Sequence, residues 1–123
     1  MKVGVVIKAQ SPRAFWFRVF DNVEDKINVG SFVTLDNYEN KVNGPILARV
    51  TRVIRHNYLV DDRVIAQLGS EDVINTFRDY GIDIQYIAQS TLARAVVIGY
   101  RVGTRFSKPL KPPKPMDFVY APS

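Results

Sequence analysis

Short stretches of β-branched and aromatic residues, separated by turn-forming residues, recur along this 123-residue chain and limit its fold more than any other feature. Residues 2–9 read KVGVVIKA, Ser11-Pro12 favours a turn, and residues 14–20 read AFWFRVF. We expect these two stretches to form a pair of strands.

The second stretch has two faces, because successive side chains of a strand point to opposite sides. Phe15, Phe17 and Val19 share the face that we assign to the core. The other face carries Trp16, Arg18 and Phe20. Three interpretations of this face stay open: a buried barrel face, a subunit or protein interface, or a surface on which nucleic-acid bases stack.

More strands are expected further along the chain. They are predicted over residues 31–36, 45–55, 82–87 and 92–101, with a last edge strand within residues 116–122. In the stretch 45–55 the alternation slips at Arg52-Val53, which predicts a β-bulge.

Helical spacing occurs within residues 61–80. Ser70 is suited to cap a helix, and Glu71 and Asp72 favour the positive end of its dipole, so we assign these acids to a helix start and not to a metal site. The predicted fold is all-β: a small closed or partly open β-barrel of six to seven strands, with one helical insertion at about residues 62–80.

The composition argues against catalysis by this chain alone. Cysteine is absent and His56 is the single histidine, which excludes disulfides, thiolate nucleophiles and zinc sites that need Cys. The seven glycines never form the Gly-x-x-x-x-Gly-Lys-Ser/Thr loop that cradles nucleotide phosphates. We therefore predict no catalytic, metal or cofactor site, and a chain that is not an enzyme.

Positive charge is unevenly distributed. Residues 1–20 carry +4, 45–60 carry +3 and 87–123 carry +5, whereas 21–44 carry −3 and 61–86 carry −4, which gives the net charge of +5. Such segregation is able to form a basic face for nucleic-acid phosphates. A solvated surface of mixed charge is the alternative interpretation.

The C-terminal stretch has a composition of its own. Residues 108–115 read KPLKPPKP, which predicts an extended, polyproline-like segment with few backbone hydrogen bonds. We divide the chain into a barrel domain, 1–107, and a proline-rich exit segment with a possible edge strand, 108–123. A structural strap or connector is preferred over a ligand for a Pro-x-x-Pro-binding groove. The candidate contacts to DNA phosphates are Lys108, Lys111 and Lys114.

The chain contains no run near the ~20 apolar residues that a membrane span needs, and its N-terminus lacks the pattern of a secretory signal. We expect a soluble, cytoplasmic protein with no membrane partner.

The order of these elements resembles the N-terminal barrel of the HerA-type hexameric DNA translocases, called the HAS-barrel because the ring subunits of ATP synthase have a similar one. The resemblance covers nearly the whole chain. It rests on the strand Val3–Val6, the stretch Val29–Val33, the strand Ile46–Val53, the helix from Ser70, the strand Ala93–Gly99 and the proline-rich exit that ends in Phe118–Ala121.

The resemblance implies a non-catalytic barrel that acts in ring assembly and in docking a partner nuclease during DNA end processing and repair. The partners would be the chain's own motor domain, expected after Ser123, other copies in a hexameric ring, and a NurA-like nuclease. ATP-Mg²⁺ is implied only for the motor domain. Trp16, Arg18 and Phe20 are the candidate subunit or nuclease contacts. We expect DNA binding by such a barrel to be weak and non-specific. The alternative is a free-standing small-barrel nucleic-acid-binding protein.

Overall fold

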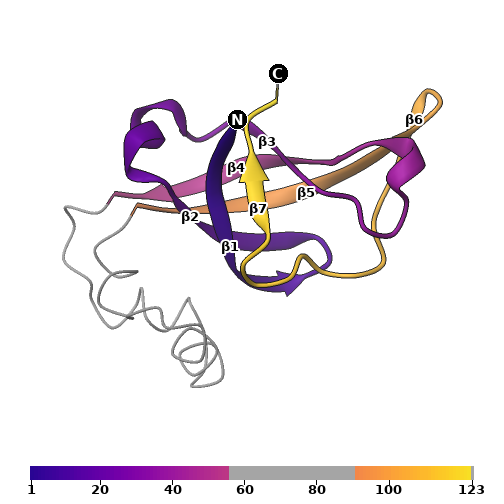
Figure 1. The fold of residues 1–123 in the computed structure, drawn as a ribbon, viewed down its shortest axis with the longest axis horizontal. Coiled ribbons are helices and arrows are strands. Elements are labelled where there is room, and N and C mark those ends of the chain that lie inside the picture. Colours follow the sequence, from indigo (N-terminus) through magenta and orange to yellow (C-terminus); the bar gives the residue numbers. More distant parts are fainter. Residues whose placement is uncertain (56–90, 123) are drawn as a thin grey trace.

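The computed structural model describes residues 1–55 and 91–122 (Figure 1). Its strands are β1 Lys2–Ser11, β2 Ala14–Val19, β3 Phe32–Leu35, β4 Ile46–Ile54, β5 Leu92–Val102, β6 Arg105–Ser107 and β7 Phe118–Tyr120. Two short 3-10 helices, η1 Asp21–Lys26 and η2 Lys41–Asn43, lie in the connections. The predicted helical insertion, the predicted strand 82–87 and His56 lie outside the described residues.

Six of these strands close into an antiparallel barrel. The strand order is β1, β2, β5, β4, β3 and β7, and β7 returns to β1. Each of the six therefore has a hydrogen-bonded neighbour on both sides, and none presents the row of unpaired backbone groups found at a sheet edge. The predicted all-β fold with a small closed barrel is confirmed.

β7 is where the sequence prediction is wrong. An edge strand was predicted for residues 116–122, whereas β7 pairs with β1 on one side and with β3 on the other. Leu35 faces Val119 across the second pair, and the Ala121 N–H donates to the Met1 carbonyl at 2.9 Å. The physical reason is closure, because β1 and β3 would otherwise both be open edges. The two chain ends consequently lie side by side (Figure 1).

β6 is a strand that the sequence analysis missed. It pairs only with β5, as the second arm of a hairpin that extends beyond the barrel (Figure 1). Val102 faces Arg105 across a two-residue loop, in which Gly103 has a φ of 62°. A glycine between two β-forming residues is the signal that would have located this turn.

The barrel interior is filled by inward-facing side chains of all six strands. Phe15, Phe17 and Val19 are fully buried in it, as predicted from the alternation of β2. The β4–β5 pair shifts register between Val50 and Arg52, so the predicted bulge is present one position earlier than the slip in the sequence. Arg49 faces solvent by the alternation that precedes the shift, and Arg52, after the shift, is exposed as well.

Gly99 offers a test of the β5–β6 hairpin. Its φ is 134°, and an added Cβ would collide with the carbonyl oxygen of Ser107 on β6. We expect Gly99→Ala to lower the free energy of unfolding by about 1–3 kcal/mol or more, measured by urea denaturation.

The matched control is Gly103→Ala. Its φ is also positive, at 62°, but nothing lies within 4 Å of the added Cβ, so only the backbone cost of about 1–2 kcal/mol applies. If Gly103→Ala is the more damaging of the two, the close packing of β6 on Gly99 is wrong.

Candidate functional site

The predicted contact face of β2 divides in the structure. Trp16 is 2% exposed, whereas Arg18 and Phe20 are partly exposed and form a cation–π contact with 5.3 Å between the guanidinium carbon and the ring centre. A partner is able to reach Arg18 and Phe20 directly, but Trp16 only after a rearrangement. The interface role stays a prediction for the exposed pair.

Trp16 is buried outside the main core cluster. The other buried hydrophobic residues outside that cluster lie on the same three strands, β1, β2 and β5, and are Val5, Ile7, Ala14 and Leu92. The Trp16 indole N–H is buried and has no hydrogen-bond partner among the residues that the structure describes. Alternation along β2 correctly separates Trp16 from Phe15 and Phe17, but burial on both faces of the strand has no signal in that pattern.

The proline-rich segment 108–115 is bound to the barrel by a carboxylate. Glu39, in the loop after β3, accepts hydrogen bonds from the backbone N–H of Leu110 at 3.1 Å and of Lys111 at 2.5 Å. Pro109 is buried, and the Lys114 N–H donates to the Asp117 carboxylate at 3.0 Å. The segment contains no helix or strand, its polyproline-like conformation stays a prediction, and acidic side chains accept hydrogen bonds from three of its backbone donors.

The three candidate phosphate-binding lysines are exposed on this segment. Lys111 and Lys114 line a pocket of about 280 Å³ together with three acids, Asp36, Glu39 and Asp117. Carboxylates so close to the ammonium groups reduce the local positive potential. Phosphate binding by Lys108, Lys111 and Lys114 stays a prediction, and their surroundings are of mixed charge.

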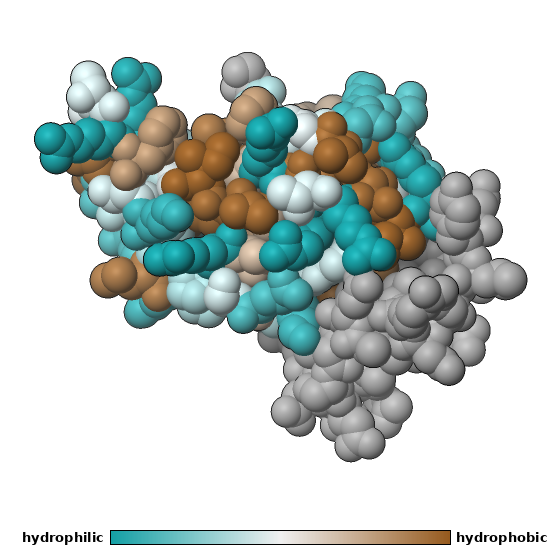
Figure 2. Space-filling view, turned by 180° about the vertical axis from the view of Figure 1, so that it is seen from behind, coloured by the Kyte–Doolittle hydropathy of each residue, from teal (hydrophilic) through white to brown (hydrophobic). Residues whose placement is uncertain are grey.

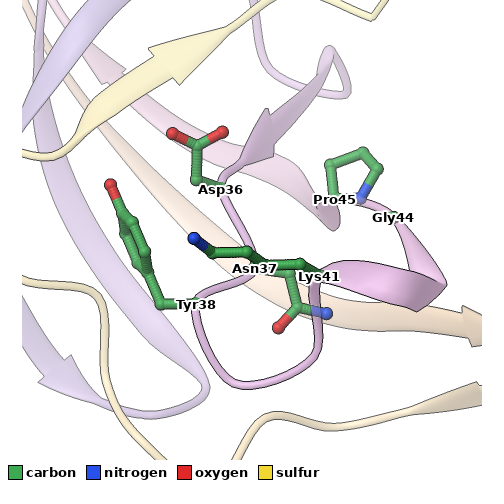
Figure 3. Close-up of a pocket in the computed structure, with 6 residues that line it drawn as sticks. All are labelled: Asp36, Asn37, Tyr38, Lys41, Gly44 and Pro45. Atoms are coloured by element: carbon green, nitrogen blue, oxygen red, sulfur yellow. The ribbon is translucent and has the colours of Figure 1, made fainter.

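A second, more open pocket of about 560 Å³ lies in the β3–β4 connection (Figure 3). Its lining residues are Asp36, Asn37, Tyr38, Lys41, Gly44 and Pro45. Asn37 is buried and its side-chain oxygen accepts a bond from the Asn40 N–H at 3.0 Å, which holds the loop in a turn. In Figure 3 the Lys41 side chain extends toward the side of the pocket where Tyr38 lies.

Tyr38 is held in its protonated form at neutral pH. The carboxylate of Asp117 raises the pKa of Tyr38 above 10.0, and burial and the carboxylate of Asp36 act in the same direction. The phenol therefore acts as a hydrogen-bond donor and not as a base. Among the described residues no group of three or more His, Cys, Asp or Glu side chains is arranged to hold a metal ion.

Arginines outside the predicted site form a third feature. Arg55 donates to the carbonyls of Glu24 and Ile27 at 2.7 and 3.1 Å, so this side chain anchors the end of η1. Arg49 and Arg52, by contrast, are exposed on β4, and Arg94 is partly exposed on β5 opposite Arg52. The charge of the segment 45–60 pointed to this region, but which arginines face solvent follows only from strand register.

Neither protein-family models nor curated proteins match this chain. The resemblance to the HAS-barrel therefore stays a hypothesis drawn from the order of the elements. Within residues 1–55 and 91–122, no helix has the length and apolar character to cross a membrane.

The attachment of the proline-rich segment to Glu39 is directly testable. In Glu39→Ala the amide N–H groups of Leu110 and Lys111 lose their acceptor, and we expect their hydrogen exchange to accelerate by about tenfold. Lys111→Ala is the matched control, because it removes a nearby charge but keeps both N–H donors. Unchanged exchange at Leu110 and Lys111 in Glu39→Ala would show that this carboxylate does not hold the segment.

The raised pKa of Tyr38 predicts that the stability of the fold depends on pH. A pKa raised above its unfolded value of 10.0 means that folding favours the protonated phenol, so this contribution is fully present below about pH 10 and is lost as pH rises through the folded pKa. We expect Asp117→Asn to lower the pKa of Tyr38, followed through its ring resonances by NMR. Asp25→Asn, in η1, is the control and should leave the Tyr38 titration unchanged.

Proposed function

We propose that this chain is a non-catalytic docking barrel of a HerA-like, ATP-driven DNA translocase, acting in ring assembly and in docking a NurA-like nuclease during DNA end processing. The observation that carries the proposal is how the barrel closes. β7 follows the proline-rich segment and completes the barrel between β1 and β3. The sequence resembles the HAS-barrel in that same series of strands, with the proline-rich exit before the last one.

Barrel closure also bears on how partners are bound. Because all six barrel strands are paired on both sides, a partner strand finds no open edge on the barrel itself; among the described strands only β6, in the hairpin beyond the barrel, has a single neighbour. We therefore place docking on side chains of the outer wall. Arg18 is partly exposed there, and Phe20, which follows β2 and packs against the core cluster, is partly exposed as well. Both residue types are enriched at protein interfaces. We propose these two as contacts to the nuclease or to a neighbouring barrel.

In this proposal the chain binds no nucleotide. ATP-Mg²⁺ and the energy of hydrolysis belong to a motor domain, and the barrel supplies position and partner choice. A non-catalytic role agrees with the absence from the sequence of the glycine-rich loop that binds nucleotide phosphates.

The second candidate function is a free-standing nucleic-acid-binding barrel. The observation in its favour is the group of solvent-facing arginines on β4 and β5. A motor domain encoded directly after Ser123 would favour the docking barrel over this alternative.

Nuclease capture tests the proposed docking role. We expect the chain to bind the NurA-like nuclease encoded in the same genome, and Arg18→Ala with Phe20→Ala to weaken that binding at least about tenfold, since interface arginines and aromatics often contribute 2 kcal/mol or more. Isothermal titration calorimetry gives the affinity.

The control variant is Val42→Ala. Val42 is 95% exposed in η2, on a different connection of the barrel, and its removal should leave the affinity unchanged. Absence of any binding to the nuclease, with the chain folded, would contradict the docking role. Binding that survives the double variant would contradict only the assignment to Arg18 and Phe20.

A further inference from the structure

The strands of the barrel carry charge of one sign. None of the seven described strands contains Asp or Glu. Their basic residues are Lys2, Lys8, Arg18, Arg49, Arg52, Arg94, Arg101 and Arg105. All acidic side chains in the described part of the chain lie in connections, so the strand surface itself is cationic.

Strand register gathers three of these arginines on one side of the barrel. Arg49 on β4 is paired across the strands with Phe32 on β3 and with Val96 on β5. Arg52 on β4 is paired with Arg94 on β5. Neighbouring strands are about 4.8 Å apart, so the three guanidinium groups share an area on the order of 10 Å across. We call Phe32, Arg49, Arg52, Arg94 and Val96 the basic face.

Two positive charges of the basic face, those of Arg49 and Arg94, are available to a ligand. Arg94 donates to the side-chain oxygens of Gln10 at 3.0 Å and Thr51 at 3.2 Å, both of which are neutral. Arg49 is exposed and forms no ion pair with any residue that the structure describes. This differs from Lys111 and Lys114, which share their pocket with three carboxylates.

The basic face also contains apolar surface. Phe32 is 49% exposed, and Val96 and Leu47 are partly exposed beside it. In Figure 1 β4 and β5 lie behind β1 and β7, and the opposite view in Figure 2 shows apolar and hydrophilic side chains side by side. A surface with only phosphate contacts would not need an exposed aromatic ring.

We propose that the basic face binds single-stranded nucleic acid, with Arg49 and Arg94 on backbone phosphates and one base stacked on Phe32. Guanidinium groups suit phosphate oxygens because their donors are planar and permanently charged. An aromatic side chain stacks on any unpaired base, whereas the bases of a duplex are already stacked on each other. Binding is therefore sequence-tolerant, prefers single strands and depends on salt. It is independent of nuclease docking and of ring assembly.

The test is fluorescence anisotropy of the complete chain with oligo(dT) and oligo(rU) of about 12 nucleotides, over a series of salt concentrations. Each lost phosphate contact should reduce the slope of log K against log salt by about 0.7. We expect Arg49→Gln with Arg94→Gln to reduce it by about 1.4, and Phe32→Ala to weaken binding by about tenfold or more. The two oligonucleotides distinguish DNA from RNA as the preferred strand.

Two matched variants define the surface. Lys111→Gln with Lys114→Gln removes the same amount of charge from the proline-rich segment and should leave the salt slope nearly unchanged. Phe32→Tyr keeps a ring for stacking and should restore affinity. Urea denaturation confirms that each variant is folded.

The proposal fails if neither oligonucleotide binds at low salt, or if the lysine pair lowers the salt slope as much as the arginine pair. It also fails if duplex DNA binds as tightly as single strands and Phe32→Ala changes neither the affinity for the duplex nor the affinity for the single strand. In that last case the face is a general anion surface, and an acidic protein becomes the partner to test.

Discussion

Closure of the barrel by β7 is the interaction on which the rest of this structure depends. β1 and β3 are at the two ends of the row β1, β2, β5, β4 and β3, and the last strand closes this row because its backbone pairs with both. Two further backbone hydrogen bonds hold the residues just before β7 against β1. The Met116 N–H donates to the Val6 carbonyl at 2.8 Å, and the Val6 N–H donates to the Asp117 carbonyl at 2.7 Å. Removing residues 116–122 would expose two sheet edges at once, which favours aggregation.

The proline-rich segment leads the chain from β6 to the position of β7 between β1 and β3. Its four prolines lack N–H groups and favour an extended chain, so the segment crosses the barrel side with few backbone donors to satisfy. Glu39 and Asp117 accept bonds from three donors of the segment, which places acidic side chains beside the lysines. The same geometry that orders this segment thus makes it a poor anion-binding surface, and the cationic character of the molecule is left to the strands.

Much of this fold could be predicted from alternation and turn residues. The limits of β2, β4 and β5 and the core face of β2 follow from local patterns, because each strand's side chains alternate whatever its neighbours are. The position of β7 could not be predicted in this way, since a strand with partners on both sides has the same local pattern as an edge strand. Burial of Trp16 is likewise a property of tertiary packing, and β6 was missed because its three residues are too few to show a pattern.

The location of the cationic surface could not be predicted from local sequence either. Counting charges along the sequence assigns +5 to residues 87–123 and directs attention to Lys108, Lys111 and Lys114, which are consecutive in a distinctive segment. Folding places Lys111 and Lys114 in one pocket with three carboxylates, and it places Arg94 from the same stretch next to Arg52 across a strand pair. Electrostatic potential depends on distance in space, so a segment's net charge predicts the presence of a cationic surface but not its place. Only the register of β4 against β5 identifies which arginines act together, and that register is itself set by the shift between Val50 and Arg52. The bulge is therefore the local feature that sets which residues of two separate stretches, β4 and β5, lie side by side on the basic face.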